Sequence, residues 1–510
     1  MDRINIEKIQ NDNNRLKFHL MPPKGWMNDP NGLCQLNGTY HVFFQYSPDD
    51  PKGGGDRGWG HYVSSDLINW RYVGMPVRPD NILDKDGSYS GSAFLKDGKM
   101  YIYYTGNVKE EGEHDYTYSG RQANTIMLIS RDGYNFTKKQ CVLDAKDYPD
   151  YYTCHIRDPK VWCQDGEYYM IQGGRLNGRK KAEFIDCQKQ RNSGGLSDAD
   201  KEKILRDNDD KGSVLIFESS DLIEWKICNE VTVGEDFGYM WECPDYFEVD
   251  GHKLLSLSPQ GLPGLKYMYQ NVYQSGHFDV KGEITGKAEL ENFREWDMGF
   301  DFYAPQTFED ESGRRIIIGW AGIGDIEYDN IPTIEEGWQH TLTVPRNITI
   351  QNGRVCQWPV KELEKLRDRE VVISGDMTAE LEGKTADIVV NNIADKEIKT
   401  LIYCGDKESG IQLSYKDNVL SMEFVGKKGM AIGRGRDIRQ FPVERLDDMR
   451  ILIDNSIVEV YINGGEYVMT TRYYMTEKNL GIVFESSSSD KSVFDNTKVW
   501  QMKNMEVQYE

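Results

Sequence analysis

The stretch LNGTYHVFFQY, residues 36–46, joins a short turn that contains Gly38 to an apolar and aromatic segment. A glycine-containing turn between two strand-like segments is typical of a β-hairpin. The same pattern recurs four more times along the chain. The further copies are KDGKMYIYYTG (96–106), QDGEYYMIQGG (164–174), VDGHKLLSLSP (249–259) and ESGRRIIIGWAG (311–322).

The spacing of these copies indicates a repeat of about 60 residues. The turn glycines are Gly38, Gly98, Gly166, Gly251 and Gly313, with separations of 60, 68, 85 and 62 residues. The longest gap contains residues 188–212, which are polar, charged and without strand character, and removing these 25 residues leaves 60. A unit of this size holds about four short strands, so five units predict a five-bladed β-propeller. The alternative is a β-sandwich with coincidental turns.

The pattern changes after the fifth unit. Residues 356–370 are mostly charged and predict a linker with a short helix. Short alternating strands with polar turns follow, most clearly around residues 463–465, and such strands are typical of a β-sandwich. We therefore expect an all-β protein with a propeller over residues 1–355, a linker over 356–370 and a sandwich over 371–510.

Composition excludes several classes of function. The chain has 61 basic and 83 acidic residues and a net charge of −22, which argues against binding nucleic acid or anionic membranes. No apolar run approaches the ~18 residues of a membrane span. Residues 1–18 lack the apolar core of a secretory signal, so a cytoplasmic location is expected. Nine scattered cysteines without a CxxC pair argue against disulfides or a zinc site.

Three acidic residues stand at nearly the same place in their repeats. Asp29 and Glu242 each lie nine residues before the turn glycine of their unit, and Asp158 lies eight before. The first strand of a propeller blade lines the central channel and has an unpaired edge, where proline is tolerated. Prolines follow at Pro30, Pro159, Pro244 and Pro305. We therefore expect the three acids to meet in one funnel, although each alone is an ordinary turn residue.

Two facing carboxyl groups suit the cleavage of a glycosidic bond, because one attacks as the carboxylate and the other donates a proton. We expect backbone N–H groups to keep Asp29 ionised, and Arg157 to do the same for Asp158. Burial among aromatic side chains would keep Glu242 protonated. His61 and His155 lack ligand partners at metal-binding spacing, so we expect hydrogen-bonding roles for them, without a metal or other cofactor.

Several motifs together resemble glycoside hydrolase family 32. They are WMNDPNG, FFQYSP, WGHYVSSDLINW, YSGSA, RDP, ECPD and DFYAPQTF, and the resemblance covers nearly the whole chain. It implies a five-bladed propeller with a sandwich and retaining hydrolysis of β-fructofuranosides. It also implies roles for the acids: Asp29 as nucleophile, Glu242 as acid and base, and Asp158 as stabiliser of the transition state. Positions matching the fructose pocket are Asn28, Gln45, Ser90, Arg157, Tyr303 and Trp320.

One segment departs from the family pattern. Many members carry a tryptophan between the QY and WGH motifs, whereas this chain has a glycine-rich loop over residues 52–58, and Trp59 is the only tryptophan of the region. We expect Trp59 to contribute to the pocket.

The expected partner is a small fructoside: sucrose, sucrose 6-phosphate or a short fructo-oligosaccharide. Fructosyl transfer, exo-hydrolysis of levan or inulin, and non-catalytic fructan binding are the alternatives. The sandwich is a candidate homodimer interface, although no sequence feature indicates one.

Overall fold

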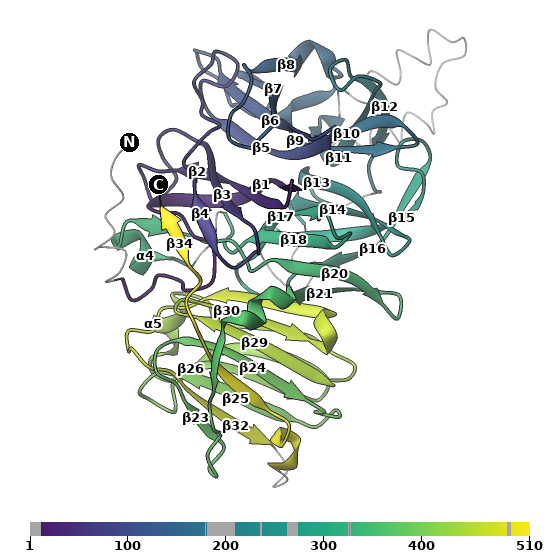
Figure 1. Ribbon diagram of the computed structural model, residues 1–510. Coiled ribbons are helices and arrows are strands. Elements are labelled where there is room, and N and C mark those ends of the chain that lie inside the picture. The colour runs from purple at the N-terminus through teal and green to yellow at the C-terminus, as the bar shows by residue number, and fades with distance from the viewer. Residues whose placement is uncertain are drawn as a thin grey trace.

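The computed structural model describes residues 12–509 with the exception of 179, 181–209, 235–236, 263–273, 325, 327 and 487–490. The insertion predicted for 188–212 lies outside the described residues except for its last three. Figure 1 shows two β-rich bodies, the N-terminal one above and the C-terminal one below. In the part of the chain that is described, no helix is long and apolar enough to cross a membrane, and all eight cysteines are free.

The upper body consists of five antiparallel sheets, one for each repeat. The first contains β1 (Gly25–Leu36), β2 (Thr39–Ser47), β3 (Gly58–Ser64) and β4 (Trp70–Tyr72). The second contains β5 (Ser88–Lys96), β6 (Lys99–Lys109), β7 (Arg121–Ser130) and β8 (Gln140–Leu143). The third contains β9 (Tyr152–Gln164), β10 (Glu167–Leu176), β11 (Lys211–Ser219) and β12 (Lys226–Val231). The fourth contains β13 (Met240–Val249), β14 (His252–Gln260), β15 (Gly276–Gly282) and β16 (Ala288–Glu295). The fifth contains β17 (Tyr303–Glu309), β18 (Arg315–Trp320), β20 (Arg346–Gln351) and β21 (Arg354–Pro359).

Tight turns set the register of these sheets. In the first four, a two-residue turn joins the first two strands, and both turn residues have positive φ, for example Asn37 at 51° and Gly38 at 78°. This is the type I′ arrangement, whose twist matches that of the flanking strands. The first strands β1, β5, β9, β13 and β17 contact one another in this order, and β17 also contacts β1. The five sheets therefore form a closed ring with these strands at its centre.

Two distant segments extend the first sheet. β19 (Trp338–Gln339) pairs in parallel with the start of β1, and β34 (Val507–Tyr509) pairs in parallel with β4. Figure 1 shows β34, in yellow, running from the lower body up to the propeller. The sheet that carries Asp29 is therefore built from three separate parts of the chain.

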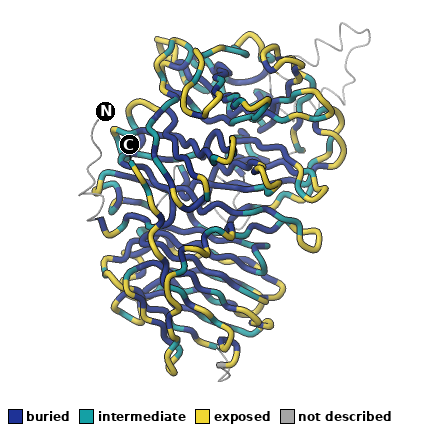
Figure 2. The backbone as a smooth tube through the Cα atoms, viewed as in Figure 1, coloured by how far each residue is buried: buried dark blue, intermediate teal, exposed yellow. Residues whose placement is uncertain are grey.

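The lower body is a sandwich of two six-stranded sheets. One contains β22 (Arg367–Glu370), β33 (Lys498–Met502), β24 (Thr385–Asn391), β29 (Asp448–Asp454), β30 (Ile457–Ile462) and β31 (Tyr467–Arg472). The other contains β23 (Thr378–Glu380), β32 (Gly481–Ser486), β25 (Ile398–Tyr403), β26 (Gly410–Lys416), β27 (Val419–Val425) and β28 (Ile438–Pro442). Figure 2 shows that buried residues fill the middle of both bodies. The predicted all-β fold of propeller and sandwich is confirmed.

The helical turns that are named in the described part of the chain are short. They are η1 (Ala145–Asp147), α4 (Ile331–Glu335), η2 (Lys361–Leu366), α5 (Gly429–Gly433), η3 (Asn463–Gly465) and η4 (Lys491–Phe494). The helix expected in the linker corresponds to η2. The linker itself is shorter than residues 356–370, because β21 pairs with β20 as far as Pro359 and β22 pairs with β33 from Arg367.

A buried network of charges joins the propeller to the sandwich. Arg346 of β20 lies 2.9 Å from Glu459 of β30 and 3.3 Å from Asp297, and all three side chains are fully buried. His19 contacts Asp454 at 2.9 Å and Glu459 at 3.0 Å. Burial alone would raise the pKa of Glu459, but Arg346 and His19 lower it to about 2. The two bodies therefore share a fixed ionic contact.

Candidate active site

Each central strand interrupts its ladder near its start. The register shifts lie between Met27 and Pro30, Ser88 and Gly91, Arg157 and Lys160, Glu242 and Asp245, and Tyr303 and Gln306. A bulge leaves residues unpaired and redirects their side chains. Asp158 and Cys243, both inside such bulges, have φ values of 63° and 47°. Pro159, Pro244 and Pro305 lie inside these bulges, where they remove no regular ladder bond.

Asp29 is held by two side chains of the bulges. Its Oδ2 accepts a hydrogen bond from the Ser90 hydroxyl at 2.6 Å, and its Oδ1 accepts one from the Asn28 amide at 3.0 Å. Burial raises the pKa of Asp29, these two hydrogen bonds lower it, and the charge of Glu242 raises it further. The donors that stabilise the carboxylate are thus mainly side chains rather than the expected backbone groups.

Asp158 lies on the other side of the Cys243 thiol. The Cys243 sulfur is 3.7 Å from Oδ2 of Asp29 and 3.7 Å from Oδ2 of Asp158, so one side chain separates the two carboxyl groups. The backbone N–H of Cys243 also donates to Asp158 at 2.9 Å. Burial raises the pKa of Asp158 to about 7, although Arg157 opposes the shift.

Glu242 accepts three hydrogen bonds. Arg157 donates to Oε1 at 2.6 Å, and Gln260 and Tyr303 each donate to Oε2 at 2.6 Å. These surroundings differ from the aromatic burial expected for Glu242, because polar donors occupy both oxygens. Arg157 lies nearer to Glu242 than to Asp158, at 2.6 Å against 3.9 Å, and its charge lowers the pKa of Asp158 in the expected direction without overcoming burial.

The acids do not share one position in the repeat. The hairpins of the third and fourth sheets have equal lengths, and Glu242 stands where Arg157 stands in the third sheet. Cys243 accordingly takes the place of Asp158. The expectation that all three acids occupy the same position of the repeat is wrong by one residue for Glu242. Contact with Arg157 instead brings Glu242 to the other two acids.

Two of the expected pocket residues agree with a place near the acids, whereas Trp59 does not. Gln45 is buried, donates to the Ser88 carbonyl at 2.8 Å, and has an Oε1 without a partner among the described residues. Trp320 is buried with its ring centroid 6.3 Å from that of Tyr303. The expectation that Trp59 contributes to the pocket is wrong. Its side chain is 0% exposed in the core, where Nε1 donates to the Tyr89 carbonyl.

The glycine-rich loop covers Trp26. Gly53 has a φ of 80°, and a Cβ added there would lie 3.1 Å from the Trp26 ring. The Trp26 indole donates to Oδ1 of Asn28 at 2.7 Å. Because an indole can only donate, the Asn28 oxygen faces Trp26 and its NH₂ group faces Asp29. The loop thus packs against Trp26, which bonds Asn28, which in turn bonds Asp29.

Sequence reasoning missed Gln260, Cys243 and the contact made by Trp26. Gln260 follows the fourth hairpin in SPQ and lies opposite Met240, two residues before Glu242. Counting residue pairs back from the turn between β13 and β14 would have led to within one residue of Gln260. The bulge in β13 shifts the register by that one residue. The two histidines considered as ligands make hydrogen bonds instead: His61 to His41 at 3.0 Å, and His155 to Arg157 at 2.7 Å.

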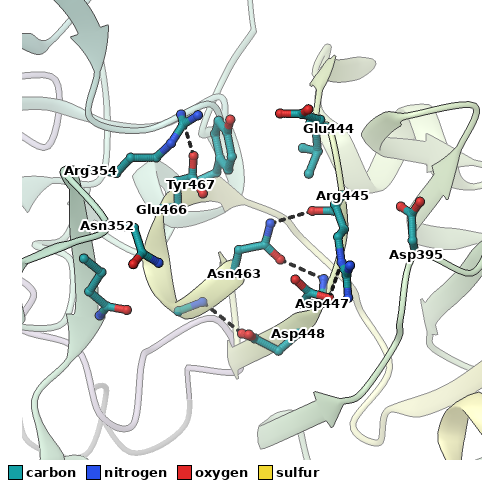
Figure 3. Close-up of a pocket in the computed structure, with 13 residues that line it drawn as sticks. Asn352, Arg354, Asp395, Glu444, Arg445, Asp447, Asp448, Asn463, Glu466 and Tyr467 are labelled. Atoms are coloured by element: carbon teal, nitrogen blue, oxygen red, sulfur yellow. Dashed lines mark hydrogen bonds and ion pairs between the residues drawn. The ribbon is translucent and has the colours of Figure 1, made fainter.

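A separate hollow lies between the β20–β21 turn and the sandwich (Figure 3). Its volume is about 590 Å³, and none of the predicted site residues line it. Its charged side chains pair with one another, as Arg354 does with Glu466 at 2.7 Å and Arg445 with Asp447 at 2.7 Å. The three acids therefore stay the candidate site.

Both the propeller and the sandwich match models of known protein families. The model for the glycosyl hydrolases family 32 N-terminal domain matches residues 19–191 and 204–359, and the family 32 C-terminal model matches residues 433–501. A sucrose-6-phosphate hydrolase of Bacillus subtilis (strain 168) is 36% identical, over 97% of this chain and 96% of the relative. A raffinose invertase of Escherichia coli is 32% identical, over 95% of this chain and 94% of the relative.

Solved structures agree. Sucrose-6-phosphate hydrolase from Lactobacillus gasseri has a TM-score of 0.79 at 25% identity and covers 98% of this chain and 95% of its own. A Bombyx mori family 32 β-fructofuranosidase mutant in complex with sucrose has a TM-score of 0.78 at 26% identity, covering 99% of this chain and 97% of its own. The chain belongs to glycoside hydrolase family 32.

Proposed function

We propose that the protein is a retaining β-fructofuranosidase that cleaves the terminal β-D-fructofuranoside of sucrose, sucrose 6-phosphate or short fructo-oligosaccharides. The observation that carries the proposal is the convergence of Asp29, Asp158 and Glu242 around Cys243 and Arg157. The names of the relatives, sucrose-6-phosphate hydrolase and raffinose invertase, support the substrate class.

In the first step, Asp29 attacks the anomeric carbon of fructose while Glu242 gives a proton to the departing glycosidic oxygen. Ser90 and Asn28 hold the two oxygens of Asp29, which restricts the direction of attack. The product of this step is a fructosyl ester of Asp29 and a free leaving group.

In the second step, the ionised Glu242 takes a proton from water, and the water oxygen attacks the same carbon and releases Asp29. Arg157, Gln260 and Tyr303 stabilise the carboxylate form of Glu242 that this step requires. Asp158, beside both reacting groups, hydrogen-bonds the fructose hydroxyls as charge develops on the ring.

Replacement of the nucleophile tests the proposal. Asp29→Asn keeps the shape but removes the attacking charge, so kcat on sucrose should fall by about 10³ or more. Asp49→Asn is the matched control, because Asp49 is exposed just before the glycine-rich loop 52–58, and this variant should keep normal turnover. Turnover near that of the wild type in Asp29→Asn would rule out the nucleophile assignment.

A second variant tests the proton donor. Glu242→Gln cannot protonate the leaving oxygen, so sucrose should be slowed far more than an aryl fructoside whose leaving group needs no proton. Equal slowing of both substrates would exclude this role for Glu242.

Fructosyl transfer and the hydrolysis of levan or inulin stay predictions, which product analysis and a substrate panel would test. The presence of all three acids speaks against a purely fructan-binding role. The cytoplasmic location and the homodimer also stay predictions.

A further inference from the structure

Basic side chains gather beside Glu242, although the chain as a whole carries a net charge of −22. Arg157 donates to Nδ1 of His155 at 2.7 Å. Burial, followed by the positive charges of Arg157, Arg121 and Arg175, lowers the pKa of His155 to about 3. Arg121 of β7 lines a hollow together with Thr153 and Cys154, which precede His155 on β9. Arg175 of β10 stands opposite the same segment of β9, because Gly174 pairs with Ile156 and Leu176 with Tyr152.

The imidazole itself is a neutral donor. Because the Arg157 guanidinium can only donate, Nδ1 of His155 must accept, and the ring proton lies on Nε2. His155 thus adds an N–H donor to the cluster without needing to become charged.

Arg175 is held rigidly on the leaving-group side of Glu242. Its Nε donates to Asp210 at 2.7 Å, and its guanidinium carbon lies 4.7 Å from the ring centroid of Tyr239. The backbone N–H of Tyr239 donates to the carbonyl of Gln260, whose side chain contacts Glu242. Since Glu242 protonates the departing oxygen, the leaving group must lie next to this group of residues.

Arg121 supplies the charge that is not neutralised. Arg157 pairs with Glu242 and Arg175 pairs with Asp210, whereas the described part of the chain offers Arg121 no ion pair. Its Nε is buried and lacks a hydrogen-bond partner there. Arg121 also lines a hollow of about 170 Å³ with Thr153, and Asp150 is the acidic residue of that hollow.

Building on the proposed function, we propose that Arg121, His155 and Arg175 bind a phosphate monoester on the leaving group, as in sucrose 6-phosphate. The unneutralised charge of Arg121 attracts a phosphate anion, and guanidinium groups offer paired N–H donors to its oxygens. The cluster would therefore favour a phosphorylated glucosyl leaving group over an unphosphorylated one.

Competing substrates test the inference. Arg121→Gln should raise the KM for sucrose 6-phosphate about tenfold more than the KM for sucrose, which corresponds to about 1.4 kcal/mol. Arg121→Lys, which keeps the charge, should recover part of the difference. Arg131→Gln removes an exposed arginine at the far end of the same sheet and should leave the ratio of the two KM values unchanged.

Binding measured without turnover separates this inference from the proposed function. Calorimetry should show that the wild type binds glucose 6-phosphate at least about tenfold more tightly than glucose, and that Arg121→Gln loses this preference. Equal affinity for the two sugars, or an unchanged preference in Arg121→Gln, would overturn the phosphate site even if sucrose is hydrolysed. A protein that binds glucose 6-phosphate selectively but hydrolyses neither substrate would retain the site and refute the proposed function.

Discussion

Asp158 is buried in the bulge of β9, next to Arg157 and to the backbone N–H of Cys243. These partners favour its carboxylate, yet burial is the larger influence, and the pKa rises to about 7. A site with three neighbouring carboxyl groups cannot readily hold three negative charges, so one of them is the natural place for a proton. With its pKa at about 7, Asp158 gains and loses a proton near neutral pH, in addition to the proton that Glu242 carries in the first step of the proposed reaction.

This proton affects stability in a defined direction. A group whose pKa rises on folding stabilises the protein below its ordinary pKa, and that contribution is lost as the pH passes the folded-state value. Asp158→Asn removes the titration, so relative to the wild type it should gain about 2–3 kcal/mol in unfolding free energy between about pH 5 and about pH 8. Urea denaturation at both pH values measures it. Asp97→Asn, in an exposed turn, is the control, and parallel curves for Asp158→Asn and the wild type would contradict the prediction.

The strands and turns were the elements most open to prediction. Type I′ turns need positive φ at two successive residues, so Asn-Gly and Asp-Gly pairs reveal them in the sequence. The bulges could not be predicted in the same way, because an extra residue in one strand leaves no mark of its own. For this reason Glu242 was placed one residue out of phase, and Gln260 was missed.

The same limit applies to loops. The glycines at 53–55 indicated a loop but not what it packs against, since contact with Trp26 depends on the packing of two separate segments. Trp59 illustrates the opposite error: a tryptophan next to a site motif suggested a pocket wall, although the side chain points into the core.

The loop offers a matched pair of substitutions. Gly53 and Gly55 have φ values of 80° and 78°, but only a Cβ at Gly53 would press on Trp26. Each change to alanine should cost about 1 kcal/mol of backbone strain. Gly53→Ala alone should also displace Trp26 and Asn28 and lower kcat/KM on sucrose by about tenfold. Steady-state kinetics of the two variants measures the difference, and equal activities would show that the loop does not act on Asp29.

At the scale of the whole molecule, the propeller and the sandwich are joined by buried ions rather than by apolar packing alone. Arg346 contacts both Glu459 and Asp297, so its loss would leave buried Asp297 without a cation and Glu459 with His19 alone. Breaking such a contact from one side is costly, because the remaining charges stay buried.

Two arginines that cross the same interface allow a comparison. Arg346→Met should reduce the unfolding free energy by about 3–5 kcal/mol. Arg354→Met breaks a partly exposed pair with Glu466 and should cost at most about 1 kcal/mol. Urea denaturation followed by tryptophan fluorescence measures both. Similar losses for the two variants would show that burial does not set the strength of this contact.

The return of β34 to the first sheet has a consequence for the order of events during synthesis. Domains tend to fold from the N-terminus as the chain leaves the ribosome, and contacts between distant segments form late. β1 to β4 emerge early, yet the outer strand of their sheet, residues 507–509, emerges only after the whole sandwich. The sheet that carries Asp29 is thus begun early and completed late, so a nascent chain stalled within the sandwich holds the proposed nucleophile in an unfinished sheet.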